Sequence, residues 1–118
     1  MVAVLLLSFH RTAAVVHERE EVMFYAHPQE YTLSVEELID YYSQEYGVDR
    51  DVMYNVMWCE SRGKIDAVGT SGEYGVYQYM PATFEMFSAH FERPMAWKST
   101  VDQVELTAWA FSQNLHSH

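Results

Sequence analysis

The sequence predicts a mostly α-helical domain, and three features support this prediction. Apolar residues recur at helical spacing in four segments of the chain. Residues that favour helix ends stand at the borders of these segments. Four of the five glycines lie between Gly63 and Gly75, which predicts one long loop, with at most a short strand, among the helices.

The first helix is expected to begin at Ser34. Ser34 and Glu37 have the spacing of a capping box, in which each side chain accepts a hydrogen bond from the backbone N–H of the other residue. The apolar positions that follow keep helical spacing, and they are Leu38, Ile39, Tyr42 and Tyr46. Gly47 stands where a left-handed residue would end the helix.

The second helix is expected to begin at Asp49, a favourable N-cap, and to run toward Gly63 with Glu60 in its last turn. Its apolar positions are Val52, Met53, Val56 and Met57. The glycines that follow predict a loop over residues 63–79, with a short strand at residues 76–79.

Two further helices are expected after this loop. Pro81 suits the first turn of the third helix, because proline has no N–H to leave unbonded there. Thr100 and Gln103 have capping-box spacing and predict the start of the final helix. The apolar faces comprise Phe84 and Phe87 in the third helix and Val104, Ala108, Phe111 and Leu115 in the last.

The length of 118 residues and a hydrophobic content of 49% fit one compact domain with a single core. We place this domain at residues 32–118 and interpret residues 1–31 as an N-terminal arm or a remnant signal segment. The apolar run at residues 1–9 is shorter than the about 20 residues that span a bilayer, so we expect no stable membrane insertion. We expect a monomer.

Charge and cysteine content narrow the possible partners. Seven basic and seventeen acidic residues give a formal net charge of −10, which argues against nucleic acid and repels other polyanions. Cys59 is the single cysteine, so no internal disulfide can form. The six histidines lack metal-ligand spacing, and we expect neither a metal nor a cofactor.

Glu60 is the main candidate for acid–base chemistry. Val56 and Met57 precede it by four and three residues, so its carboxyl should emerge beside apolar side chains. Partial burial and the negative end of the helix dipole both favour the protonated acid. Such an acid can donate a proton to the leaving oxygen of a glycosidic bond. The alternative is a surface ion pair with Arg62 or Lys64.

Residues 58–84, WCESRGKIDAVGTSGEYGVYQYMPATF, resemble the signature of the soluble lytic transglycosylase (SLT) family, a member of the lysozyme-like superfamily. Glu60 and Ser61 are similar to the family's catalytic Glu-Ser pair. Residues 72–83 resemble its G-x-x-G-L-x-Q-x-M-P-x-T stretch, and the two motifs occur in the family's order. The resemblance implies a lysozyme-like helical fold, in which the glycine-rich loop or short strand forms one wall of a substrate groove.

This resemblance implies cleavage of the β-1,4 bond between N-acetylmuramic acid (MurNAc) and N-acetylglucosamine (GlcNAc) in peptidoglycan glycan strands. Glu60 would protonate the glycosidic oxygen and then take a proton from the muramoyl 6-hydroxyl, which closes a 1,6-anhydro ring. The action would be extracytoplasmic, in the periplasm, in the cell wall, after secretion, or in association with a phage or the envelope. The implied substrate-binding residues are Ser61, Gly75, Tyr77, Gln78, Tyr79 and Met80.

Two alternatives stay open. If Asp66 or Glu73 faces Glu60 across the groove, a hydrolase similar to the goose-type lysozymes is the better interpretation. A peptidoglycan-binding or interaction module without turnover is the other alternative. It is suggested by departures from the family: the family's later tyrosine-containing helix is not recognisable, and Cys59 lacks the partner cysteine that some relatives carry beyond the last helix. These departures predict either a truncated C-terminus or a free, buried Cys59.

Overall fold

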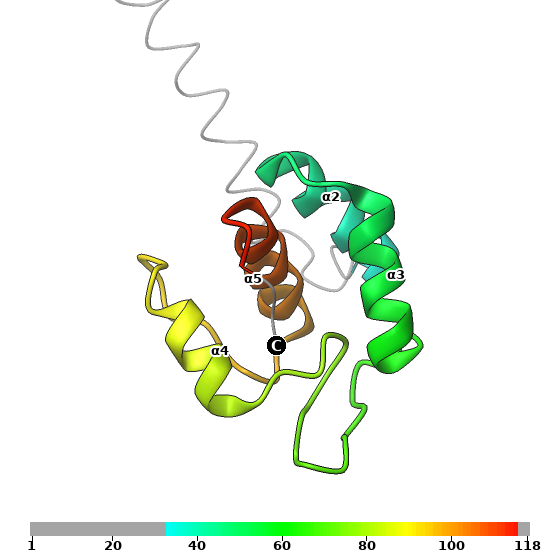
Figure 1. The fold of residues 1–118 in the computed structure, drawn as a ribbon, viewed down its shortest axis with the longest axis vertical. Coiled ribbons are helices and arrows are strands. Elements are labelled where there is room, and N and C mark those ends of the chain that lie inside the picture. The colour runs from blue at the N-terminus through cyan, green and yellow to red at the C-terminus, as the bar shows by residue number, and fades with distance from the viewer. Residues whose placement is uncertain (1–32, 116–118) are drawn as a thin grey trace, which may run out of the picture. The chain divides into compact units, whose positions relative to one another are not determined.

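The computed structural model describes residues 33–115, and the predicted arm at residues 1–31 lies outside them. Four helices form this part of the chain, which confirms the mostly helical prediction (Figure 1). They are α2 (Val35–Tyr46), α3 (Arg50–Ser61), α4 (Pro81–Ser88) and α5 (Thr100–Ser112). None of these helices is long and apolar enough to cross a membrane.

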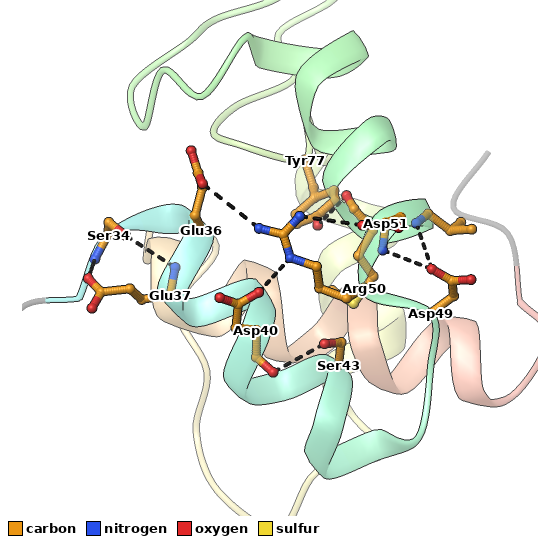
Figure 2. A network of polar contacts seen from close by, with 11 residues as sticks. Ser34, Glu36, Glu37, Asp40, Ser43, Asp49, Arg50, Asp51 and Tyr77 are labelled. Carbon is orange, nitrogen blue, oxygen red and sulfur yellow. Dashed lines mark hydrogen bonds and ion pairs between the residues drawn. The ribbon is translucent and has the colours of Figure 1, made fainter.

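Both ends of α2 and the start of α3 lie at the predicted residues, whereas α3 ends at Ser61, with Arg62 as its C-cap. Ser34 caps α2, with its hydroxyl accepting from the Glu37 N–H at 3.1 Å and the Glu37 carboxylate accepting from the Ser34 N–H at 3.0 Å (Figure 2). Gly47 ends α2 in the left-handed region with a φ of 67°. Asp49 caps α3 by accepting from two backbone N–H groups of the first turn. Local sequence therefore determines these boundaries.

Arg50, at the start of α3, connects the first two helices. Its guanidinium pairs with Asp40 and Glu36 on α2, and with Asp51 on α3 (Figure 2). All four side chains are substantially exposed to solvent. We call residues 34–51 the α2–α3 corner, because the capping groups and the ion pairs of Arg50 lie within it.

The start of α5 differs from the prediction. Ser99 is the N-cap, and its hydroxyl accepts from the Asp102 N–H at 3.2 Å. The predicted capping box of Thr100 and Gln103 is therefore wrong. Gln103 has the spacing of a capping glutamine, but its side chain is 1% exposed and bonds to distant backbone groups instead.

The segment between α3 and α4, residues 62–80, is called the glycine loop here. The predicted strand at residues 76–79 does not form within it, where the backbone pairing consists of isolated bridges from Val68 to Tyr74 and from Tyr74 to Tyr79. Gly75 and Gln78 have φ values of 88° and 52°, which interrupt the extended backbone that a strand requires. The bridges fold the loop back on itself.

The core joins the helices to the glycine loop. In Figure 1, α5 lies between α2 and α4, and it contacts both. Three loop side chains, those of Val76, Tyr77 and Tyr79, are as deeply buried as the helical core residues. The buried helical residues include Leu38, Ile39, Met53, Met57, Phe84, Phe87, Val104, Leu106, Ala108 and Ala110. The glycine loop is thus part of the packed interior.

Candidate active site

Glu60 lies in the last turn of α3 and is half-buried. Within residues 33–115 its carboxylate makes no hydrogen bond and no ion pair, so the alternative pairing with Arg62 or Lys64 is not observed. Arg62 instead lies over the ring of Trp58, with its guanidinium carbon 5.4 Å from the ring centroid. No residue of the described part of the chain therefore competes with a ligand for this carboxylate.

Two left-handed residues end α3 directly after the Glu60–Ser61 pair. Arg62 and Gly63 have φ values of 57° and 81°, and Arg62 donates its N–H to the Trp58 carbonyl. Ser61 is buried, with its hydroxyl donating to the Met57 carbonyl at 3.3 Å and accepting from the Gly63 N–H at 3.1 Å. Both hydrogen-bonding directions of Ser61 thus serve the helix end that carries Glu60.

Tyr79 is the side chain of the glycine loop on which the charge of Glu60 acts. Burial raises the pKa of Tyr79 to about 12, and the negative charge of Glu60 contributes to this rise. The Tyr79 hydroxyl lies 2.8 Å from the Thr107 hydroxyl of α5, and its ring packs edge-on against Phe84. The phenol therefore stays protonated at neutral pH and joins α5 and α4 to the site.

Tyr77 supports the site from inside the core. Its side chain is 2% exposed, and its hydroxyl donates to the Met53 carbonyl of α3 at 2.8 Å (Figure 2). Burial raises the pKa of this phenol well above its ordinary value. This hydrogen bond ties the glycine loop to the helix that carries Glu60.

Gln78 adopts a left-handed backbone conformation that is uncommon for residues other than glycine. Its side-chain nitrogen donates to the carbonyls of Ala67 and Gly75, at 3.0 and 2.8 Å. Its side-chain oxygen lies close to Gly69, where an added Cβ would be 2.8 Å away. Gln78 therefore links the two sides of the glycine loop, and Gly69 leaves room for it.

The side chain of Gln103, on α5, is hydrogen-bonded to the backbone of the glycine loop. Its side-chain oxygen accepts from the Tyr77 N–H at 3.1 Å, and its nitrogen donates to the carbonyls of Tyr74 and Trp97, each at 2.8 Å. A Cβ at Gly75 would lie 2.5 Å from the Gln103 nitrogen, so only glycine allows this close approach. Sequence reasoning missed this role, although Gln103 and Thr107 are polar residues one turn apart beside the apolar face of the last helix.

The residues predicted to bind substrate differ in exposure. Met80 is exposed and Gln78 is half-buried, so both can meet a ligand. The others, Ser61, Gly75, Tyr77 and Tyr79, are buried. Their observed contacts orient the loop and the end of α3.

The other predicted acids and the cysteine lie as follows. Asp66 is exposed, and Glu73 accepts from the Ser71 N–H at 2.8 Å. Cys59 is free and exposed, so the expectation of a buried thiol is wrong. Cys59 lies on the outer surface of α3, because the buried positions of that helix are Met53, Met57 and Ser61.

A separate hollow of about 330 Å³ is lined by residues of α2 and α5. Tyr46 donates to Glu105 there at 2.7 Å, and burial raises the pKa of Tyr42 to about 12. The lining residues are Tyr41, Tyr42, Glu45, Tyr46 and Glu105. This hollow shares no residue with the glycine loop and is distinct from the expected groove.

Within residues 33–115, no group of three or more His, Cys, Asp or Glu side chains is arranged to hold a metal ion.

Comparison with known proteins adds one finding to this geometry. A family model described as the transglycosylase SLT domain matches residues 37–114. The matched segment contains Glu60, the whole glycine loop and Gln103. No curated protein and no solved structure matches the chain.

Proposed function

Since the chain belongs to the transglycosylase SLT domain family, we propose that it is a lytic transglycosylase acting on peptidoglycan outside the cytoplasm. The bond cleaved is the β-1,4 linkage between MurNAc and GlcNAc. The observation that carries this proposal is the state of Glu60, which is half-buried and makes no hydrogen bond or ion pair with residues 33–115. The resemblance of Glu60 and Ser61 to the family's catalytic Glu-Ser pair also supports the proposal.

In the proposed reaction, Glu60 has two successive roles. It first donates its proton to the glycosidic oxygen, so that the GlcNAc unit leaves as an alcohol. The N-acetyl group of MurNAc stabilises the positive charge that develops at C1. The Glu60 carboxylate then removes the proton of the 6-hydroxyl, whose oxygen attacks C1 and closes the 1,6-anhydro ring. The proton balance is zero, and no water is consumed.

The surrounding residues position this chemistry. Ser61 fixes the end of α3, while Tyr77 and Gln78 hold the glycine loop beside it. Fixed geometry matters because a single acid–base group must reach two different oxygens in turn. Met80 and the side-chain oxygen of Gln78 supply ligand contacts, and the buried loop residues keep those contacts in place.

The test is digestion of purified peptidoglycan by the wild type and by Glu60→Gln, with the released muropeptides identified by mass spectrometry. We expect anhydro products, one water lighter than hydrolysed ones, and a fall of about 100-fold or more in the variant, since a positioned acid–base group contributes that much. Asp66→Asn is the matched control and should retain activity.

Each other outcome has a definite meaning. Hydrolysed ends that vanish with Glu60→Gln would identify a hydrolase similar to the goose-type lysozymes. Loss of activity in Asp66→Asn or Glu73→Gln would point to the second carboxylate of such an enzyme. A folded wild type that binds peptidoglycan but releases nothing would contradict the enzyme proposal and identify a binding module.

A further inference from the structure

Lys98 is held above two aromatic rings at the edge of the glycine loop. Its ammonium nitrogen lies 5.1 Å from the ring centroid of Tyr74 and 5.7 Å from that of Trp97. Both distances are within the about 6 Å over which a cation is attracted to a ring face. Lys98 is exposed and forms no ion pair within residues 33–115. The ring faces therefore localise the charge, and its N–H donors remain open to an anion.

The two rings contact each other, and partly buried hydrogen bonds hold their residues in place. Tyr74 and Trp97 lie 5.7 Å apart between centroids, although 23 positions separate them in sequence. The Gln103 nitrogen donates to both of their carbonyls, and the Trp97 indole N–H donates to the Tyr79 carbonyl at 2.8 Å. The support under Lys98 is thus part of the same hydrogen-bonded unit as the glycine loop.

This unit also connects Lys98 to the candidate catalytic residue. Tyr74 and Tyr79 exchange backbone hydrogen bonds in both directions, at 3.1 and 3.2 Å. The Tyr79 phenol is in turn close enough to Glu60 for the carboxylate to raise its pKa. Lys98 and Glu60 are therefore connected through the same hydrogen-bonded unit, the one that contains Tyr74 and Tyr79.

The charge distribution singles out the same region. Of the five cations within residues 33–115, Arg50 and Arg93 are paired with carboxylates, whereas Arg62, Lys64 and Lys98 are not. Residues 58–80 contain three acids and two of these unpaired cations, which gives this segment a formal charge of −1. When Lys98 is counted with the segment, the formal charge of the region is zero. The chain as a whole carries −10. Within residues 33–115, the excess of negative charge therefore lies on residues outside this region.

We propose that Lys98, seated on Tyr74 and Trp97, binds a carboxylate of the peptide-substituted glycan and so selects anionic over neutral glycan strands. The proposal rests on the proposed function, because it takes peptidoglycan as the polymer bound. An ammonium that is positioned and unpaired gains a charge-assisted hydrogen bond with a carboxylate and gains less from a neutral amide. Lys98 is thereby a specificity-determining residue for the reaction of Glu60.

The test measures binding in the Glu60→Gln background, where turnover is blocked. The probes are a muramoyl dipeptide with a free carboxylate and its carboxamide counterpart, titrated while the Trp97 indole N–H signal is followed by NMR. We expect Lys98→Met to weaken binding of the carboxylate probe about five-fold, the order of one partly exposed ion pair, and to leave the carboxamide probe unchanged. Lys64→Met is the matched control, since it removes the same charge from an exposed lysine without an aromatic seat.

Three results would overturn the inference. They are an unchanged affinity of Lys98→Met for the carboxylate probe, an equal loss in Lys64→Met, and a Glu60→Gln protein with Lys98 intact that does not prefer the carboxylate probe. Circular dichroism confirms that each variant is folded. Failure of the proposed function is distinguishable: a wild type that prefers the carboxylate probe but never cleaves peptidoglycan contradicts turnover and leaves the role of Lys98 intact.

Discussion

The glycine loop and the α2–α3 corner are both rich in polar contacts, but these contacts lie in opposite surroundings. At the corner, the ion pairs of Arg50 are exposed, and the helices already satisfy most of the backbone. In the loop, backbone groups without helical partners are bonded to Gln103, a side chain that is 1% exposed. Irregular chain must find such partners, because an unbonded buried polar group costs more than a surface contact gains. We therefore expect the stability of the glycine loop to depend far more on single side chains than the stability of the α2–α3 corner does.

The largest expected effect is that of Gln103→Ala. The substitution removes three hydrogen bonds. It leaves the Tyr77 N–H and the Trp97 carbonyl without their described partners, whereas the Tyr74 carbonyl keeps its hydrogen bond from the Tyr79 N–H. We expect the free energy of unfolding, measured by urea denaturation, to fall by about 3 kcal/mol or more, and peptidoglycan cleavage to fall with it. Gln113→Ala, at the exposed end of α5, is the control and should change little. Equal effects of the two substitutions would show that α5 does not hold the loop.

The next largest effect is expected at two glycines of the glycine loop. Comparing them separates the cost of a steric clash from the cost of a left-handed backbone conformation. Gly75 and Gly72 both have positive φ, but an added Cβ meets Gln103 at 2.5 Å in the first case and open space in the second. We expect Gly72→Ala to cost about 1 kcal/mol, the left-handed penalty alone, and Gly75→Ala to cost about 2 kcal/mol more. Thermal or urea unfolding of the two variants measures the difference. Matching costs would mean that Gln103 moves aside freely.

The same contrast explains what the sequence could predict. The ends of α2 and the start of α3 depend on residues within four positions of each other. The capping roles of Ser34, Gly47 and Asp49 can therefore be predicted from the sequence alone. Pro81 at the first turn of α4 was also predicted for a local reason. By contrast, the contact of Gln103 with Tyr77 spans 26 positions. Local spacing made Gln103 resemble a capping residue, and nothing local distinguishes the two roles.

The candidate site divides in the same way. The choice of Glu60 as the candidate acid rests on its motif and on its place near a helix end, which are local properties. The seat of Lys98 was not predicted, because Tyr74 and Trp97 meet only through the fold. The expected strand at residues 76–79 failed since the left-handed Gln78 is stabilised by its own side chain, through bonds to Ala67 and Gly75. One available signal was the pair of polar residues, Gln103 and Thr107, beside the apolar face of the final helix.

The smallest effect is expected at the α2–α3 corner. Arg50→Met removes the ion pairs with Asp40, Glu36 and Asp51, but solvent screens these charges and their flexible side chains lose entropy when they pair. Its urea midpoint should shift less than that of Gln103→Ala or Gly75→Ala, and the shift should vanish in about 1 M salt, where the screening length is about 3 Å. Lys64→Met, which removes an exposed cation without an ion pair in the described part of the chain, is the control. The loss in Gln103→Ala should persist in salt, because buried amide hydrogen bonds carry no net charge to screen. If Arg50→Met instead lost as much stability as Gly75→Ala, and the loss persisted in salt, the two regions would contribute equally to stability.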